Sequence, residues 1–330
     1  IINGYERERT LCGQREKQLE PYCNQYPEPY MNLIENVIGG IKHPRSVVRW
    51  LNRMCHSRLN TRPYNPNGTG IFELDWDNLV IRDACRYDIF AEESDLPGSL
   101  DSRQTLGTGT PQFIAGNFAD SQLHDTVYVA SNSWFTRMRE DINASLHAHY
   151  DIHGEYKNQW DREREISLAF PSEVTNEALE IAERYPNKRL LIHYVQPHYP
   201  YIGSFGREQF DPSKWSSVQQ AAEGLEGPVR KTIRRGYREN LNEVLPAVER
   251  LVSELPGKSA ISADHGELLG ERHNYIPMRD YGHYKKTYHE KLTTVPWHVI
   301  EDGTRREITS EPPEQSASSP DHERVNERLR

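Results

Sequence analysis

Two residues whose side chains bind metal ions stand next to each other in the last third of the chain. Asp264 and His265 follow the apolar run 259–263 and precede Gly266, within the sequence KSAISADHGELLGE. A carboxylate and an imidazole are both common ligands of divalent cations. Neighbouring strand residues point to opposite faces, but a strand end followed by glycine lets both side chains converge on one ion. The tripeptide alone fits a capping aspartate and an ordinary histidine equally well, so further ligands must come from elsewhere in the chain.

An alternation of strand-like and helix-like segments would bring such ligands together. Helical patterns cover 172–185 and 229–255, with a shorter one after Gly109. Strands alternating with helices predict a three-layer α/β/α fold with a mostly parallel central sheet, in which ligands bind at the carboxyl ends of the strands. The apolar runs predict strands at 78–83, 125–130, 189–195, 259–263 and 295–300.

The predicted strand ends deliver residues of the same chemical kind. The first ends in Asp83, and the third leads into a Gln-Pro-His-Tyr-Pro-Tyr segment that contains His198. Between them, the glycine-rich turn 107–113 places Thr108 and Thr110 before a short helix, whose free backbone N–H groups favour an anion. A divalent cation on a threonine oxygen would lower the pKa of the hydroxyl and make it a competent nucleophile.

These motifs, taken in order, resemble those of the alkaline phosphatase superfamily. The order is a strand ending in Asp, the G-T-x-T turn, the H-x-P-Y segment, D-H-G-E-x-x-G-E, and a G-H before a strand that contains Val-Pro. Within the superfamily the chain resembles the sulfatase-like branch, which includes lipoteichoic acid synthase, the phosphoethanolamine transferases and archaeal sulfatase-like proteins that carry DACRYD. The resemblance covers about residues 75–300 and implies an alkaline phosphatase-like fold.

The resemblance implies a metal site and a nucleophile. Residue by residue, Asp83, Thr110, Asp264 and His265 match the metal ligands of the family, and Thr110 is also the matching nucleophile. Thr108 is the alternative, and one of the two threonines is expected only to cap the turn or the helix. With three oxygen ligands and one nitrogen, one divalent ion is expected, with Zn or Mn favoured and Mg or Ca as alternatives.

The resemblance also implies residues that contact the substrate. His198 matches the histidine that contacts the transferred anion, and His283 matches the position of a His or Lys at the substrate oxygen or leaving group, with His273 as its rival. Arg86 is expected to pair with a phosphate or to lie at the surface, and Glu267 to support the ligands. The implied substrate-binding residues are Arg86, Thr108, His198 and His283.

The expected activity is that of a metal-dependent phosphoester hydrolase or phosphotransferase with a phosphothreonine intermediate, acting on a small molecule or on a glycan or lipid head group. Sulfatases form their nucleophile in a C/S-x-P-x-R segment, whereas this chain has GTGTPQF. A sulfatase is therefore the weaker alternative. A non-catalytic metal-binding or glycan-binding relic of the fold is the alternative from another class.

Composition sets the remaining bounds. The 330 residues carry a net charge of −9, and the mean hydropathy is −0.84. No basic run of the kind that follows a phosphate backbone stands out, so nucleic acid is not an expected partner. The four cysteines, at positions 12, 23, 55 and 85, do not form a CxxC motif. A reducing environment is the default, with Cys85 as a buried core residue.

The chain divides into three expected parts. Residues 1–70 form a polar arm followed by two short amphipathic helices within 30–59 and a turn-rich linker at 61–70. The helices are expected to pack on the main domain, with a membrane surface as the alternative. Residues 71–300 form the catalytic domain, and 301–330 a disordered polar tail. No signal peptide or membrane span is visible, which makes a cytoplasmic location the default expectation. The oligomeric state is left open.

Overall fold

The computed structural model describes residues 44–59, 64–154 and 168–313. The helices are α3 (Pro44–Leu59), α4 (Tyr87–Glu93), α5 (Thr110–Phe118), α6 (Trp134–Met138), α7 (Pro171–Arg184), α8 (Ser204–Gln209), α9 (Val218–Gly224), α10 (Val229–Glu254) and α11 (Glu290–Thr293), with short 3-10 helices at Ile71–Glu73 and Ile152–Gly154. The strands are β1 (Asn78–Arg82), β2 (Ser99–Gln104), β3 (Gln122–Ala130), β4 (Ser145–Asp151), β5 (Arg189–Tyr194), β6 (Gly257–Ala263), β7 (Leu268–Arg272), β8 (Arg279–Gly282) and β9 (Thr294–Asp302).

Seven of these strands form one mixed sheet in the order β2-β9-β6-β1-β5-β3-β4. β1 pairs in parallel with both β5 and β6, and β3 pairs in parallel with β4 and β5. Only β9 runs against its neighbours, β2 and β6. The predicted mostly parallel sheet is therefore confirmed, and the carboxyl ends of β1, β5 and β6 meet at one edge.

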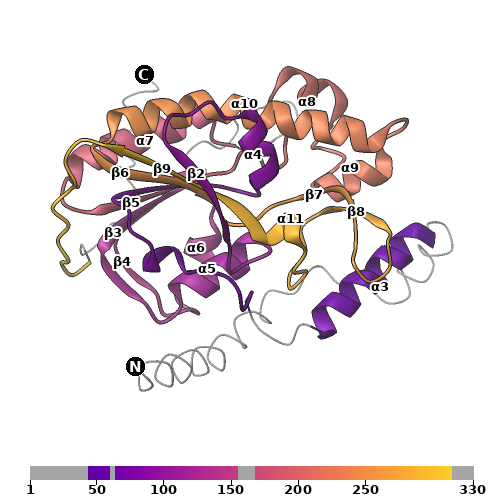
Figure 1. Cartoon of the computed structure of the whole chain (residues 1–330), viewed down its shortest axis with the longest axis horizontal. Helices are drawn as coiled ribbons and strands as arrows, with labels where there is room; N and C mark the ends of the chain where they lie inside the picture. Colours follow the sequence, from indigo (N-terminus) through magenta and orange to yellow (C-terminus); the bar gives the residue numbers. More distant parts are fainter. Residues whose placement is uncertain (1–43, 60–63, 155–167, 314–330) are drawn as a thin grey trace.

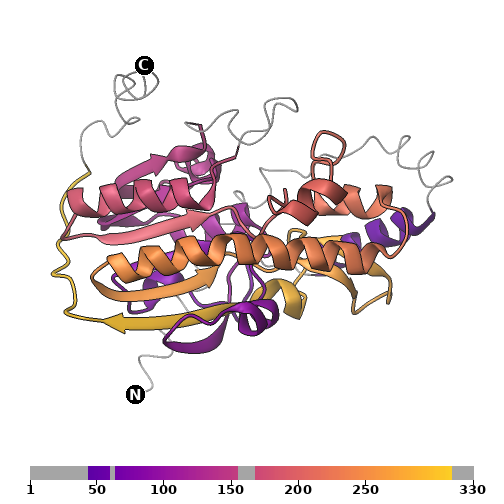
Figure 2. The same cartoon turned by 90° about the horizontal axis from the view of Figure 1, so that it is seen from above.

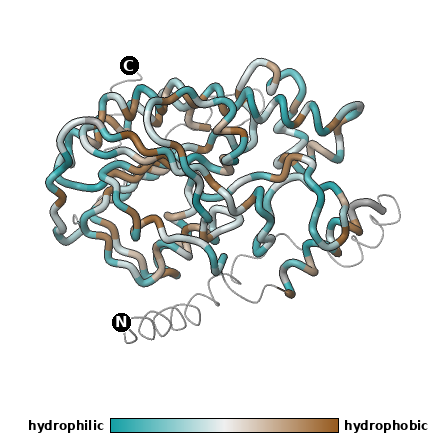
Figure 3. Tube along the Cα trace, in the orientation of Figure 1, coloured by the Kyte–Doolittle hydropathy of each residue, from teal (hydrophilic) through white to brown (hydrophobic). Residues whose placement is uncertain are grey.

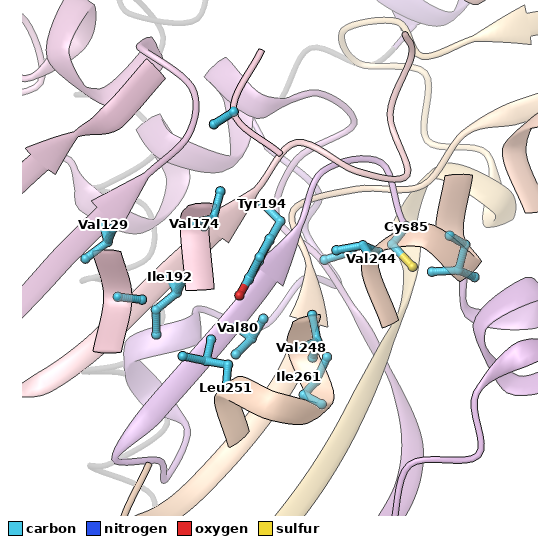
Figure 4. Packing of buried hydrophobic residues seen from close by; sticks show 14 of the residues in the cluster. Val80, Cys85, Val129, Val174, Ile192, Tyr194, Val244, Val248, Leu251 and Ile261 are labelled. Atoms are coloured by element: carbon cyan, nitrogen blue, oxygen red, sulfur yellow. The ribbon is translucent and has the colours of Figure 1, made fainter. Parts of the chain in front are cut away.

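Helices cover both faces of the sheet, which gives the predicted three-layer α/β/α fold (Figures 1 and 2). Alternate residues of the central strands enter separate cores: Val80 and Ile192 lie in the core beneath α7 and α10, while Leu79 and Leu191 lie in the core on the α5 side. Figure 4 shows the first core, in which strand valines and isoleucines meet Val248 of α10. Hydrophobic stretches of the chain gather along the central strands, whereas hydrophilic and hydrophobic segments alternate along α10 (Figure 3).

The strands that the sequence analysis did not predict are those with weak hydrophobic patterns. β2 and β4 lie at the two edges of the sheet, and β2 has no fully buried residue. An edge strand has a partner on one side only, so it needs few apolar residues. β7 and β8 pair with each other as a separate antiparallel hairpin beyond the sheet. The predicted helices 172–185 and 229–255 correspond to α7 and α10.

The segments before and after the sheet are also in contact with the body of the protein. α3 corresponds to the second of the two expected N-terminal helices, whereas the first lies outside the described residues. Within the expected linker, the Asn65 backbone N–H donates to the Leu106 carbonyl. Among the described residues, no helix has the length and apolar character needed to cross a bilayer.

The expectation of a disordered tail from residue 301 needs correction for its first part. The Arg305 guanidinium binds both Asp75 and Asp77, and Lys188 pairs with Glu311. These charged contacts hold the segment as far as residue 311 against the amino-terminal ends of the central strands. Residues 314–330 lie outside the described part of the chain.

Candidate metal centre and active site

The end of β6 places Asp264 and His265 in a fully buried position at the sheet edge. Asp264 Oδ1 accepts the backbone N–H groups of Ala84 at 3.0 Å and His265 at 2.9 Å, which orients the carboxylate. His265 Nδ1 lies 2.8 Å from the Gly266 carbonyl, so an N–H at Nδ1 leaves the Nε2 lone pair free to face the site. Gly266 is required because a Cβ there would lie 2.0 Å from the Lys291 carbonyl oxygen.

The end of β1 places Asp83 against this pair. Asp83 Oδ1 is 3.5 Å from His265 Nε2, and Asp83 Oδ2 is 3.4 Å from Thr110 Oγ1. Ala84 then adopts a positive φ of 58°, and its N–H donates to Asp264. A left-handed conformation at a non-glycine residue is a strained turn, and here it lies where the two strand ends are joined.

The glycine-rich turn supplies the threonine. Thr110 is the first residue of α5, and its Oγ1 lies 2.8 Å from Asp264 Oδ2 and 3.4 Å from His265 Nε2. The structure therefore brings together the four side chains expected as metal ligands. The Thr108 hydroxyl, in contrast, donates to the Tyr284 carbonyl at 2.8 Å and lies 3.0 Å from Gln112 Oε1. Thr108 thus anchors the turn and does not face the cluster.

The electrostatics of this cluster fit a cation. Burial, and next the nearby carboxylates of Asp264 and Glu267, raise the pKa of Asp83 well above its ordinary value. Asp83 Oδ1 is buried and has no hydrogen-bond partner among the described residues. Two buried carboxylates beside a neutral imidazole and a hydroxyl form a donor set suited to a divalent ion. Asp83, Thr110, Asp264 and His265 could hold such an ion.

His193 is a neighbour of this cluster to which the sequence analysis assigned no role. Its Nδ1 lies 2.9 Å from the Tyr128 hydroxyl, and its Nε2 lies 3.8 Å from Asp264 Oδ2. Asp83, His193 and Asp264 each offer a ligand atom within 4.8 Å of the others. Burial lowers the pKa of His193 to about 4, so its imidazole is neutral at pH 7. The signal in the sequence that could have identified it is its position as the next-to-last residue of a buried parallel strand.

A second cluster lies on the more open side of the first. His198, Glu267 and His283 each offer a ligand atom within 4.8 Å of the others, and His283 Nδ1 is 3.2 Å from Glu267 Oε1. The His283 ring lies 4.2 Å from that of His265 and 5.3 Å from that of His198, centroid to centroid. The side chain of His283 is 27% exposed, whereas Glu267 is buried. A substrate entering from solvent would meet the imidazoles before it reached Thr110.

Burial and neighbouring charges shift the pKa values of Glu267 and His198 in the second cluster. Burial alone would raise the pKa of Glu267, but the imidazole of His283, its hydrogen bond and the other two histidines outweigh burial and lower it. Burial lowers the pKa of His198, and the charge of His283 lowers it further. Glu267 is therefore a carboxylate that orients His283.

The loop that carries His198 is held from α10. The Asn240 amide donates to the carbonyls of Pro197 at 3.0 Å and His198 at 2.9 Å, and its Oδ1 accepts the Ile202 N–H at 2.9 Å. Asn240 is fully buried. The sequence analysis missed this residue because nothing in a helical pattern indicates which distant loop a side chain reaches.

Three expectations about the site need correction. Thr108 was expected to bind substrate, but the Tyr284 carbonyl and Gln112 engage its hydroxyl. Arg86 is 2% exposed, and its guanidinium binds Asp88, Glu271 and the Glu267 carbonyl, so its nitrogens are engaged within the protein and do not face a substrate. His273, the rival of His283, binds Asp280 at 2.8 Å on the far side of the hairpin.

No protein-family model matches the chain, and no curated protein sequence matches it. Among solved structures, the chain is similar to lipooligosaccharide phosphoethanolamine transferase A from Neisseria meningitidis, with 13% identity and a TM-score of 0.41 over 67% of this chain and 47% of that one. This chain thus spans about half the length of that integral membrane protein.

Two further structures illustrate the same resemblance. The C-terminal periplasmic domain of EcEptC from Escherichia coli, solved in complex with Zn, has 11% identity and a TM-score of 0.43 over 74% of this chain and 75% of that one. An alkaline phosphatase superfamily protein from Vibrio parahaemolyticus has 14% identity and a TM-score of 0.39 over 76% and 64%. The likeness to these three structures extends over 67–76% of this chain.

Proposed function

We propose that this protein is a metal-dependent phosphoester hydrolase or phosphotransferase in which Thr110 is the nucleophile. The observation that supports the proposal most is the position of Thr110 Oγ1, between Asp83, Asp264 and His265 at distances of 2.8–3.4 Å. A lone threonine has too high a pKa to act as a nucleophile. A divalent ion held by these four residues would supply the positive charge that lowers this pKa and offsets the charge of a phosphoryl group.

The residues of the chain suggest the course of the first step. The proton of the Thr110 hydroxyl passes to Asp264 Oδ2, to which it is hydrogen-bonded at 2.8 Å. Thr110 Oγ1 then attacks phosphorus, an O–P bond forms, and the bond from phosphorus to the leaving oxygen breaks. His283, oriented by Glu267, donates a proton to that oxygen, while His198 contacts a non-bridging oxygen. The product is a phosphothreonine and an alcohol.

The second step decides between hydrolysis and transfer. Attack on the phosphothreonine by water gives phosphate or a phosphomonoester, whereas attack by an alcohol gives a new ester. In either case His283 takes the proton of the attacking water or alcohol, and the Thr110 oxygen leaves phosphorus and recovers its proton from Asp264. We propose a phosphoester on a small molecule, or in a glycan or lipid head group, as the substrate, because the second cluster is open to solvent and offers imidazoles to an anionic group.

The test combines metal content with turnover. We expect about one divalent ion per wild-type chain, with Zn or Mn preferred, and turnover of aryl phosphomonoesters or phosphodiesters that exceeds turnover of aryl sulfates. Thr110→Ala should abolish turnover, whereas Thr110→Ser, which keeps a hydroxyl, should retain part of it. Intact-mass measurement after rapid quenching should detect a phosphorylated wild-type chain and an unmodified Thr110→Ala chain.

A matched control separates the chemistry from the structure of the turn. Thr108→Ser keeps a hydroxyl at position 108, which can make the same hydrogen bonds to Tyr284 and Gln112. This variant should retain turnover close to the wild-type value. Turnover that survives in Thr110→Ala would show that another group is the nucleophile. Absence of both metal and turnover in the wild type would favour a non-catalytic binding protein.

A further inference from the structure

α3 contacts the rest of the protein through its polar side chains. The Arg53 guanidinium binds both oxygens of Asp280, at 3.1 and 2.8 Å, and Asn52 exchanges two hydrogen bonds with the backbone of Ile276. His56 Nε2 lies 3.3 Å from His273 Nδ1. The helix thus lies beside the β7–β8 hairpin, away from the main sheet (Figures 1 and 2).

The opposite face of the same helix is apolar and exposed. Val47, Trp50 and Leu51, spaced as on one side of a helix, are 36%, 40% and 37% exposed. At the tip of the adjoining hairpin, Tyr275 and Ile276 are 48% and 39% exposed. Together with Leu59, these five residues account for all the large hydrophobic side chains that are exposed in the described part of the chain. We call the six residues the apolar patch.

The orientation of α3 is the reverse of that of a usual amphipathic surface helix. A helix on the surface of a globular domain normally buries its apolar face and presents polar residues to water. Here the polar face is the one in contact with the protein. Singly exposed hydrophobic residues are ordinary, but a cluster on one helix and the neighbouring hairpin indicates a binding surface.

The charge around the apolar patch favours an anionic partner. α3 contains no acidic residue and carries the exposed Arg58 near its end, in a chain of net charge −9. Arg49 and Arg53, on its protein-facing side, pair with Glu223 and Asp280. The hairpin adds the exposed Arg272 and Arg279. Two copies of this face would bring the same cations together, which disfavours self-association. Arginines beside exposed tryptophan and leucine are typical of helices that lie in the head-group region of a bilayer.

We propose that the apolar patch binds the surface of a bilayer that contains anionic lipids, with α3 lying in the plane of the head groups. The apolar side chains enter the boundary of the acyl chains, and the exposed Arg58, Arg272 and Arg279 contact lipid phosphates. This inference does not depend on the reaction proposed above. It would also bring the active site close to the bilayer, because β8 of the hairpin is followed directly by His283.

The test is sedimentation of the full chain with vesicles. We expect binding to phosphatidylcholine vesicles that contain about one third phosphatidylglycerol, weak binding to phosphatidylcholine alone, and loss of binding at high salt. The double variant Trp50→Ser/Leu51→Ser should bind at least tenfold more weakly, and Arg58→Glu about tenfold more weakly. Arg139→Glu makes the same charge change at the exposed residue that follows α6, on another part of the fold, and should bind like the wild type.

Three results would overturn the proposal. The first is a wild type that remains in the supernatant with anionic vesicles, and the second is binding of the two patch variants as tight as that of Arg139→Glu. The third is a wild-type dimer in light scattering that Trp50→Ser/Leu51→Ser dissociates, which would assign the patch to a second copy of the chain. Urea unfolding midpoints equal to that of the wild type would show that the variants are folded.

Discussion

Two buried arginines near the candidate site are expected to affect stability in opposite directions. Arg82 is 0% exposed and Arg86 is 2% exposed. The three guanidinium nitrogens of Arg82 have no hydrogen-bond partner among the described residues, and the group lies 4.0 Å from the centre of the Phe90 ring. Arg86 binds the carboxylates of Asp88 and Glu271 at 2.6 and 2.8 Å.

The pKa values of the two arginines shift in opposite directions, because only Arg86 has carboxylate partners within the described part of the chain. Burial lowers the pKa of Arg82. Burial would also lower the pKa of Arg86, but hydrogen bonds and charge from Asp88 and Glu271 outweigh it and raise this pKa. The charged form is therefore disfavoured at one position and stabilised at the other.

The size of each change in the free energy of unfolding follows from the groups that the arginine contacts. Burying an unpaired ion costs several kcal/mol after relaxation, and a desolvated cation over an aromatic ring recovers about 2 kcal/mol. Arg82→Met keeps an unbranched side chain and removes the charge, so it should stabilise the fold by about 1–3 kcal/mol. Arg86→Met removes the buried partner of two carboxylates, which keep only the more exposed Arg234 and Lys291, and should destabilise the fold by about 3 kcal/mol. The value is at the low end of the range because Asp88 is 32% exposed.

The measurement is urea unfolding of the two variants and the wild type, in the presence of a chelator so that bound metal does not contribute. The expected result is a higher midpoint for Arg82→Met and a lower one for Arg86→Met, with equal slopes. A loss of more than about 1 kcal/mol in Arg82→Met would refute the reasoning. Such a loss would show that the Arg82 guanidinium has a strong partner, such as ordered water.

Two further predictions concern stability. Burial lowers the pKa of His149 to about 3, and its Nε2 is buried without a partner among the described residues. The unfolded chain then binds the proton more readily, so this histidine reduces stability as the pH falls from about 6.5 towards 3. Between pH 8 and pH 4.5 the free energy of unfolding of His149→Leu should thus rise by about 3 kcal/mol relative to that of the wild type, as measured by urea unfolding at both values. An equal difference at the two values would contradict this. Asn240→Ala removes the hydrogen bonds to Pro197, His198 and Ile202 and should cost about 3 kcal/mol, because buried backbone groups lose their partners; an unchanged unfolding midpoint would show that water replaces the amide.

The strong periodic patterns of the sequence were sufficient to predict the central part of the fold. The buried strands β1, β3, β5 and β6 appear in the sequence as apolar runs because both faces of each strand are covered. The long helices α7 and α10 were recognisable from their amphipathic spacing. The edge strands β2 and β4 were missed because they need few apolar residues.

The candidate site was predicted where ligand residues directly follow a strand. Asp83, Asp264 and His265 leave strands at a common edge, and Thr110 begins a helix at the same edge, so a parallel sheet brings them together. Arg86 also follows β1, but the acidic residues of α4 and β7 surround it and remove it from the site.

The sequence by itself determined which residues leave the buried strands, and therefore that carboxylate, imidazole and threonine groups meet at one edge of the sheet. Only the tertiary structure decided between alternatives that depend on contacts between distant segments. The Tyr284 carbonyl engages Thr108 and leaves Thr110 to face the carboxylates. The hairpin brings His283 to Glu267 and directs His273 to Asp280. Such pairings depend on chain segments far apart in the sequence, and a local pattern carries no information about them.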